Sequence, residues 1–154
     1  MPDDWKLTPR QQRALADICD TFCPSGDGVA TASELGVPAA LEQAVALNPR
    51  ASERRQLAAL LSAWDTQPMG LLGGVGFKRF SALAPEARQQ ALLAWGDSGS
   101  PQRRAVFQAL RKGALLFYYM LPGAGAGNGQ PARNPAWDAI GYDGPVGKLS
   151  DAPP

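Results

Sequence analysis

Few side chains in this sequence are able to do chemistry. Its 154 residues include 14 Asp and Glu, 15 Lys and Arg and two cysteines, but no histidine. Histidine is the commonest general base and the favoured nitrogen ligand of metals. A Ser-His-Asp or Cys-His site contained within the chain is therefore excluded. Carboxylates, Lys, Tyr and Cys remain, and we assign no catalytic residue and no metal ligand among them.

One short acidic segment resembles the second half of a calcium-binding loop. Residues 25–28 read Ser-Gly-Asp-Gly, and Glu34 follows Gly28 at the separation between the turn glycine and the final ligand. The first ligand position, however, is occupied by Cys23, whose soft thiol suits a hard cation poorly. We interpret Asp27-Gly28 as a simple turn. A calcium-responsive helical protein that uses Asp27 to Glu34 is one hypothesis for the function.

Two other patterns have similarly simple interpretations. The run Gly70-Leu-Leu-Gly-Gly-Val-Gly76 lacks the third glycine of a dinucleotide fingerprint, because Arg79 stands in its place, and no strand precedes the run. It is predicted to be a packed loop. Cys19 and Cys23 are four residues apart without two further ligands at metal spacing. We interpret them as small buried thiols.

The most informative segment runs from Asn134 to Pro145 and reads Asn-Pro-Ala-Trp-Asp-Ala-Ile-Gly-Tyr-Asp-Gly-Pro. It has neither helical nor strand period, and its prolines and glycines break regular structure. Such a segment cannot bury its own aromatic rings. It must lie across another surface, either the body of this chain or a partner. A glycine-rich hinge precedes it.

Helical periodicity dominates the rest of the chain. Leu15, Ile18, Cys19 and Phe22 follow i, i+3, i+4, i+7 spacing, and Thr8-Pro-Arg-Gln11 has the form of a capping box with proline at the first helical position. No alternating run predicts a strand. Similar patterns predict helices over residues 9–22, 38–47, 52–64, 85–95 and 101–121. A further short helix is expected around Phe80.

These elements define the expected fold and domain organisation. We expect an all-α fold, an irregular array of about five helices with a long glycine-rich loop at 65–77 and a non-helical C-terminal tail. The helical domain would cover residues 1–122, the hinge 123–133 and an extended docking tail 134–154. Residues Leu115 to Leu121 are apolar or aromatic at every position, so this helix end must be covered all round.

Composition limits the kinds of partner. The net charge of +1 argues against a nucleic-acid module and against purely electrostatic membrane binding. No stretch approaches the roughly 20 apolar residues that a transmembrane helix needs. The N-terminal residues lack the apolar run of a secretory signal. We therefore expect a soluble, cytoplasmic protein.

Several segments together resemble a known family. Residues 7–24, Leu-Thr-Pro-Arg-Gln-Gln-Arg-Ala-Leu-Ala-Asp-Ile-Cys-Asp-Thr-Phe-Cys-Pro, resemble the opening of the N-terminal helical region of long-chain (fatty) alcohol oxidases. Further motifs match in order and spacing, so that the resemblance extends over residues 7–145. These motifs are Phe77-Lys-Arg-Phe80, Ala94-Trp95 with Ser98, Arg104 and Phe107, Tyr118-Tyr119, Asn134-Pro-Ala-Trp137 and Ile140-Gly-Tyr142 with Gly144-Pro145.

The resemblance implies a function. In that family the helical region precedes a flavin-binding body of the glucose-methanol-choline type, and the related small subunit of gluconate 2-dehydrogenase is a separate helical chain that accompanies a flavoprotein. This chain lacks the flavin fingerprint, the catalytic histidine and the twin-arginine export signal of many small subunits. The resemblance thus implies a non-catalytic accessory subunit, or an N-terminal domain, that docks on and stabilises an FAD-dependent alcohol oxidase or dehydrogenase.

The same resemblance, with the aromatic content of the tail, indicates the docking residues. FAD, the base and the substrate pocket would belong to the partner. The alternative function is a self-sufficient helical module in which Tyr118, Tyr119, Trp137 and Tyr142 line a groove for an apolar small molecule. The residues expected to dock on the partner are Asn134, Trp137, Ile140, Tyr142, Pro145, Tyr118 and Tyr119.

Overall fold

The computed structural model describes residues 5–26, 28–66, 78–123 and 133–143. These residues form helices and no named strand, so the expected all-α class is confirmed. The loop at 67–77, the hinge at 124–132, Asp27 and Pro145 lie outside the described residues. The helices are α1 (Pro9–Phe22), α2 (Val37–Ala46), α3 (Ala51–Trp64), the 3₁₀ turn η1 (Phe80–Ala82), α5 (Pro85–Gly96), α6 (Pro101–Met120) and α7 (Pro135–Ala139).

Local sequence signals account for where the helices begin. The Gln11 amide N–H donates to Thr8 Oγ1 at 3.4 Å, and the Thr8 amide donates to Gln11 Oε1 at 2.8 Å. The predicted capping box of α1 is therefore formed. Proline occupies one of the first two positions of α1, α2, α5, α6 and α7, where its missing N–H costs no helical hydrogen bond.

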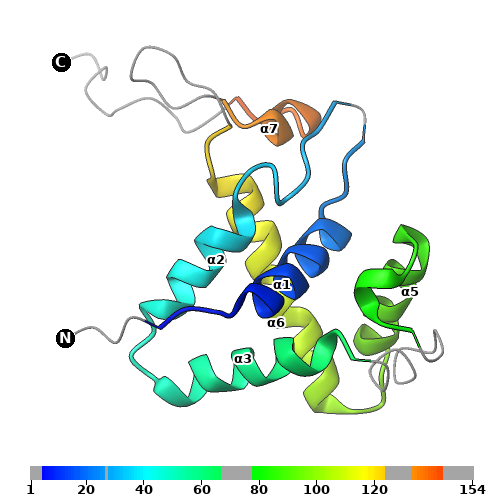
Figure 1. Ribbon diagram of the computed structural model, residues 1–154. Coiled ribbons are helices and arrows are strands. Elements are labelled where there is room, and N and C mark those ends of the chain that lie inside the picture. Colours follow the sequence, from blue (N-terminus) through cyan, green and yellow to red (C-terminus); the bar gives the residue numbers. More distant parts are fainter. Residues whose placement is uncertain (1–4, 27, 67–77, 124–132, 144–154) are drawn as a thin grey trace.

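Two helices occupy the middle of the molecule. Helix α1 contacts α2, α3, α5 and α6, while α6 contacts α1, α2, α5 and α7. In Figure 1, α1 crosses in front of α6, with α2, α3 and α5 arranged around them and α7 near the last turns of α6. The C-terminal segment therefore reaches the body of the chain through α6.

The core follows the predicted apolar stripes. Leu15 and Ile18 of α1 are buried, as is Leu61 of α3. The Trp64 ring packs against the Phe80 ring at 5.7 Å and against the Trp95 ring at 4.7 Å between centroids. These aromatic contacts join α3, η1 and α5 into one cluster.

One expected core position is exposed. The helical spacing of Leu41, Ala44 and Val45 predicts that all three face inward, but Ala44 lies at the surface. Helix α2 packs through Val37 and Leu41, which are buried, with Val45 half-buried one turn further on. Residues at i and i+4 lie along one line of a helix, and Ala44 falls beside that line.

We expected the C-terminal tail to be non-helical, but part of it forms a helix. Residues Pro135–Ala139 form one turn of helix, and Asn134 caps it by accepting from the Ala136 amide at 2.8 Å. Pro135, which we had interpreted as a helix breaker, begins the turn because proline is favoured in the first helical turn.

A half-buried ion pair joins α1 to α5. Asp17 Oδ1 lies 3.0 Å from Arg88 Nη1, and Arg88 also donates to the carbonyls of Leu83 and Ser81. Burial raises the pKa of the Asp17 carboxyl and outweighs the lowering effect of Arg88. The pair therefore orients the two helices more than it stabilises them.

None of the helices in the described ranges combines the length and the apolar character that crossing a membrane would require.

The two cysteines are separate thiols in the core, as we expected. Cys19 is 1% exposed and Cys23 5% exposed. Burial raises the pKa of Cys19 to about 12 and that of Cys23 to about 11, from an ordinary value of 9.0. Both groups are therefore neutral and unreactive in the folded chain at physiological pH.

Replacing Gly96 should destabilise the fold. A Cβ added there would lie 2.9 Å from Phe107 Cε1, on a buried ring that packs against Phe22. We expect Gly96→Ala to lower the free energy of unfolding by about 1–3 kcal/mol, measured by urea denaturation. Gly99→Ala is the matched control, since its Cβ would meet nothing within 4 Å. Equal stability of the two variants would contradict the packing described here.

The thiols predict a loss of stability at alkaline pH. Because folding raises their pKa values, the unfolded chain releases these protons above about pH 9 while the folded chain retains them. Their stabilising contribution is complete below pH 9 and is lost as the pH rises through the folded pKa values, about 11 for Cys23 and about 12 for Cys19. We expect Cys19→Ala/Cys23→Ala to show a shallower decline of unfolding free energy over this range than wild type. Parallel pH profiles of the variant and the wild type would contradict this contribution of the two thiols.

Candidate functional site

Two of the predicted docking residues, Asn134 and Trp137, bond the C-terminal end of α6, and Asn134 holds this region together. Its side chain is 0% exposed. Asn134 Nδ2 donates to the backbone carbonyls of Tyr118 and, at 2.8 Å, of Leu121. The last carbonyls of a helix lack partners within it. One amide thus satisfies two carbonyls at the end of α6 while its oxygen caps α7.

Trp137 attaches α7 to α6 a second time. Its indole Nε1–H donates to the Tyr119 carbonyl at 2.7 Å. Its ring meets the Tyr142 ring edge-on, with 5.4 Å between the centroids. The described part of the tail is therefore attached to the end of α6 through Asn134 and Trp137.

Tyr118 belongs to the core side of α6. It is 5% exposed, and its hydroxyl donates to the Ala30 carbonyl at 2.7 Å. Burial raises the pKa of this hydroxyl. Asn134 and Tyr118 thus make their contacts inside the chain, and a docking role is open only to the exposed members of the predicted set.

Those exposed members make up three of the seven large apolar side chains that are exposed in the described residues. Tyr119, Ile140 and Tyr142 are 37%, 57% and 43% exposed, and the neighbouring Leu116 and Met120 are 56% and 63% exposed. Leu116, Tyr119 and Met120 have i, i+3, i+4 spacing and share one face of α6. We call these five residues the apolar patch. Only Leu47 and Leu93 are comparably exposed among the other large apolar side chains of the described residues.

Arg133, which sequence reasoning missed, closes the tail segment on itself. Its Nε donates to Asp138 Oδ1 at 2.7 Å, and its other two nitrogens donate to the carbonyls of Asp143 and Tyr142 at 2.9 and 2.7 Å. Gly141 supplies the turn with a φ of 66°, a conformation that favours glycine. Only the spacing of Arg133 and Asp138 could have signalled this contact.

The backbones of Gly123 and Arg133 lie close together at the junction, where the tail returns to the end of α6. A Cβ on Gly123 would collide with the Arg133 carbonyl oxygen and lie 3.2 Å from Pro135 Cδ. Gly123 therefore leaves the space through which the returning chain passes beside the end of α6.

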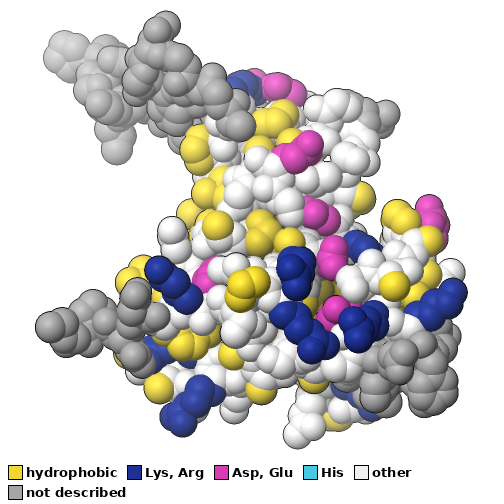
Figure 2. Space-filling model, viewed as in Figure 1, with side chains coloured by type: hydrophobic (Ala, Val, Ile, Leu, Met, Phe, Trp, Pro, Cys, Tyr) yellow, Lys and Arg dark blue, Asp and Glu magenta, His cyan; other side chains and the backbone are white. Residues whose placement is uncertain are grey.

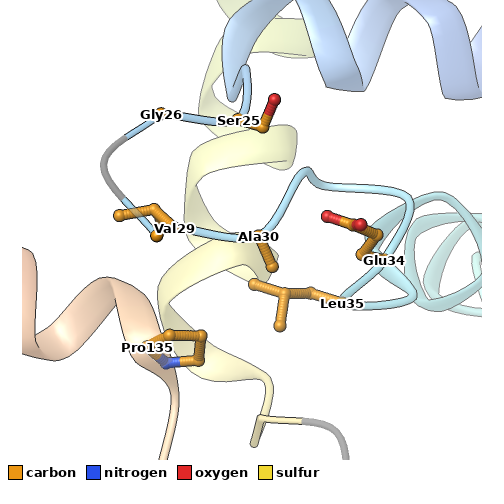
Figure 3. Close-up of a pocket in the computed structure, with 8 residues that line it drawn as sticks. Ser25, Gly26, Val29, Ala30, Glu34, Leu35 and Pro135 are labelled. Atoms are coloured by element: carbon orange, nitrogen blue, oxygen red, sulfur yellow. The ribbon is translucent and has the colours of Figure 1, made fainter.

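An open groove lies next to this junction. It has a volume of about 670 Å³ and lies between the α1–α2 loop and Pro135. Figure 3 shows Pro135 on the side of the groove opposite Ser25. Glu34, the predicted final calcium ligand, instead accepts from the Thr31 amide at 2.7 Å. The described residues contain no group of three or more His, Cys, Asp or Glu placed to hold a metal.

Comparisons with known proteins agree with the resemblance in the sequence. The family model described as Gluconate 2-dehydrogenase subunit 3 matches residues 9–144. A long-chain-alcohol oxidase, FAO4A of Arabidopsis thaliana, is 30% identical over 162 residues, covering 90% of this chain and 21% of the relative. The chain thus spans about a fifth of the length of this curated relative. No solved structure matches.

The junction predicts that Asn134→Ala releases the tail segment. The variant loses both bonds to the α6 carbonyls and the α7 cap, so the segment should detach at a cost of about 1–3 kcal/mol. We expect chymotryptic cleavage at Trp137 and Tyr142 to become about tenfold faster. Gly123→Ala should act alike, because its methyl group occupies the path of Arg133 and Pro135.

The matched control is Gln108→Ala, on the exposed face of the same helix. It should leave the cleavage rate unchanged. Wild-type cleavage rates in Asn134→Ala would contradict the role given to this side chain.

Proposed function

The chain belongs to the gluconate 2-dehydrogenase subunit 3 family, and we propose that it is a non-catalytic accessory chain of an FAD-dependent alcohol-oxidising enzyme. It would be either a separate subunit or an N-terminal domain. Its role would be to dock on the flavin-binding body and stabilise it. The partner would supply FAD, the catalytic base and the substrate pocket.

The apolar patch at the end of α6 is the observation that carries this proposal. Leu116 and Met120 are more than half exposed on a helix whose inner face is buried. An exposed apolar surface that is concentrated in one region is typical of an interaction site. Figure 2 shows hydrophobic side chains at the surface of the narrow region that joins the helical body to α7.

The relative's length supports a large partner. About four-fifths of the long-chain-alcohol oxidase lies outside the stretch matched by this chain. In that protein a domain like this one shares its polypeptide with a much larger body. By analogy, we propose that the larger body reaches this chain as a partner or as a further domain, and that it oxidises an alcohol.

The flavin is assigned to the partner on chemical grounds. A dinucleotide fold needs a strand, a glycine-rich turn and a helix in succession. The described residues contain no named strand, and the glycine run at 70–76 lacks the fingerprint spacing. The absence of histidine from the chain likewise supports placing the catalytic base elsewhere.

The alternative, a self-sufficient helical module for an apolar small molecule, has less support. It requires a pocket lined by the aromatic end of α6 and by Trp137 and Tyr142. The groove in Figure 3 is lined instead by the α1–α2 loop, with Pro135 as its single contribution from the tail. Trp137 and Tyr142 pack on one another.

Purification from the native host tests the proposal. We expect a tagged chain to copurify with a flavoprotein that shows visible flavin absorbance and oxidises alcohols, whereas the isolated chain is colourless and inactive. Leu116→Glu/Met120→Glu should weaken this complex at least about tenfold, because charges replace apolar contacts at the interface.

The control is Leu47→Glu, which places a charge at the exposed apolar residue that follows the last turn of α2 and should leave the complex intact. A chain that runs alone on gel filtration and recovers no flavoprotein would contradict the proposal.

A further inference from the structure

Hydrogen bonds within the tail segment 133–143 fix the course of its backbone. Besides the three bonds of Arg133, the Tyr142 amide donates to the Trp137 carbonyl at 2.8 Å and the Trp137 amide to the Asn134 carbonyl at 2.9 Å. Hydrogen bonds therefore hold the backbone of the segment in a closed turn, and Asn134 and Trp137 bond it to α6. Its shape is set before any partner arrives.

The Arg133–Asp138 pair contributes little to global stability. The side chains are 45% and 67% exposed, and exposed ion pairs are worth at most about 1 kcal/mol. The two bonds from Arg133 to the carbonyls of Tyr142 and Asp143 act on geometry instead. They hold the chain at Tyr142 and Asp143 against Arg133, at the start of the segment.

The consequence is a fixed presentation of two apolar side chains. Ile140 and Tyr142 are exposed, yet the backbone around them is bonded. Tyr142 rests on Trp137, whose indole reaches the Tyr119 carbonyl. The tail and the exposed face of α6 thus meet at Tyr119. Preorganised contacts bind more tightly because less conformational entropy is lost on association.

Resting on the proposed function, we infer that segment 133–143 is a preformed recognition element whose Ile140 and Tyr142 contact the catalytic body of the oxidoreductase. Arg133 is the positioning residue for both side chains. The relative's extra length argues for this occupant, since about four-fifths of that protein is body beyond the matched stretch. The exposed side chains of the patch are apolar or aromatic, so we expect the surface of the body that meets them to be apolar.

Site-specific photocrosslinking tests the surface and its occupant. A benzophenone amino acid is placed at Ile140 or, as control, at Leu47, which is 84% exposed at the end of α2 that lies away from α7 in Figure 1. In the complex from the native host, we expect Ile140 to crosslink to the flavin-containing chain and Leu47 to give no such product.

A second measurement tests the positioning role. Arg133→Gln should weaken binding of the purified flavoprotein about tenfold, with an unchanged melting temperature. Arg55→Gln is the control, because within the described residues the Arg55 side chain bonds the Ala51 carbonyl of its own helix. Unchanged affinity in Arg133→Gln would overturn the positioning role.

The remaining outcomes separate this inference from the proposed function. Crosslinking of the flavoprotein through Leu47 alone overturns the recognition element and leaves the accessory role standing. Crosslinking of Ile140 to a second copy of this chain overturns the assigned occupant. If wild type retains no flavoprotein at all, the proposed function and the inference fail together.

Discussion

The buried amide of Asn134 is the interaction on which the rest of this structure depends. Helix α6 ends where the chain turns away, and its last carbonyls would otherwise be left without partners. Asn134 donates to two of them and accepts from the first turn of α7. An unsatisfied buried polar group costs about 1–3 kcal/mol, so the return of the tail is part of the fold itself.

This arrangement divides the end of α6 into two faces. Tyr118 faces inward and bonds the Ala30 carbonyl of the α1–α2 loop. Leu116 and Met120 face outward, and the described part of the tail leaves both exposed. A helix end that is apolar all round is therefore covered on one side by its own chain. The uncovered side, extended by Ile140 and Tyr142, is what gives an accessory role its physical basis.

The sequence predicted the helical body well and the tail poorly, for a physical reason. The bounds of α1 follow from signals within a few residues, namely the Thr8 cap, Pro9 and the apolar stripe. The tail depends on contacts between residues 13 to 18 positions apart, from Asn134 and Trp137 to α6 carbonyls. Periodicity carries no information about such contacts. The aromatic residues showed that the segment had to lie on a surface, but did not determine that the surface was α6.

Hydrogen exchange of the chain, alone and bound to the proposed flavoprotein partner, tests the central claim most directly. The account predicts that the amides of Ala136 and Tyr142 are already protected in the free chain, because both donate within the folded tail. Binding should then slow exchange further only around residues 116–120 and 140–142. Unprotected tail amides in the free chain would contradict it, since they would mean that the segment folds only on its partner.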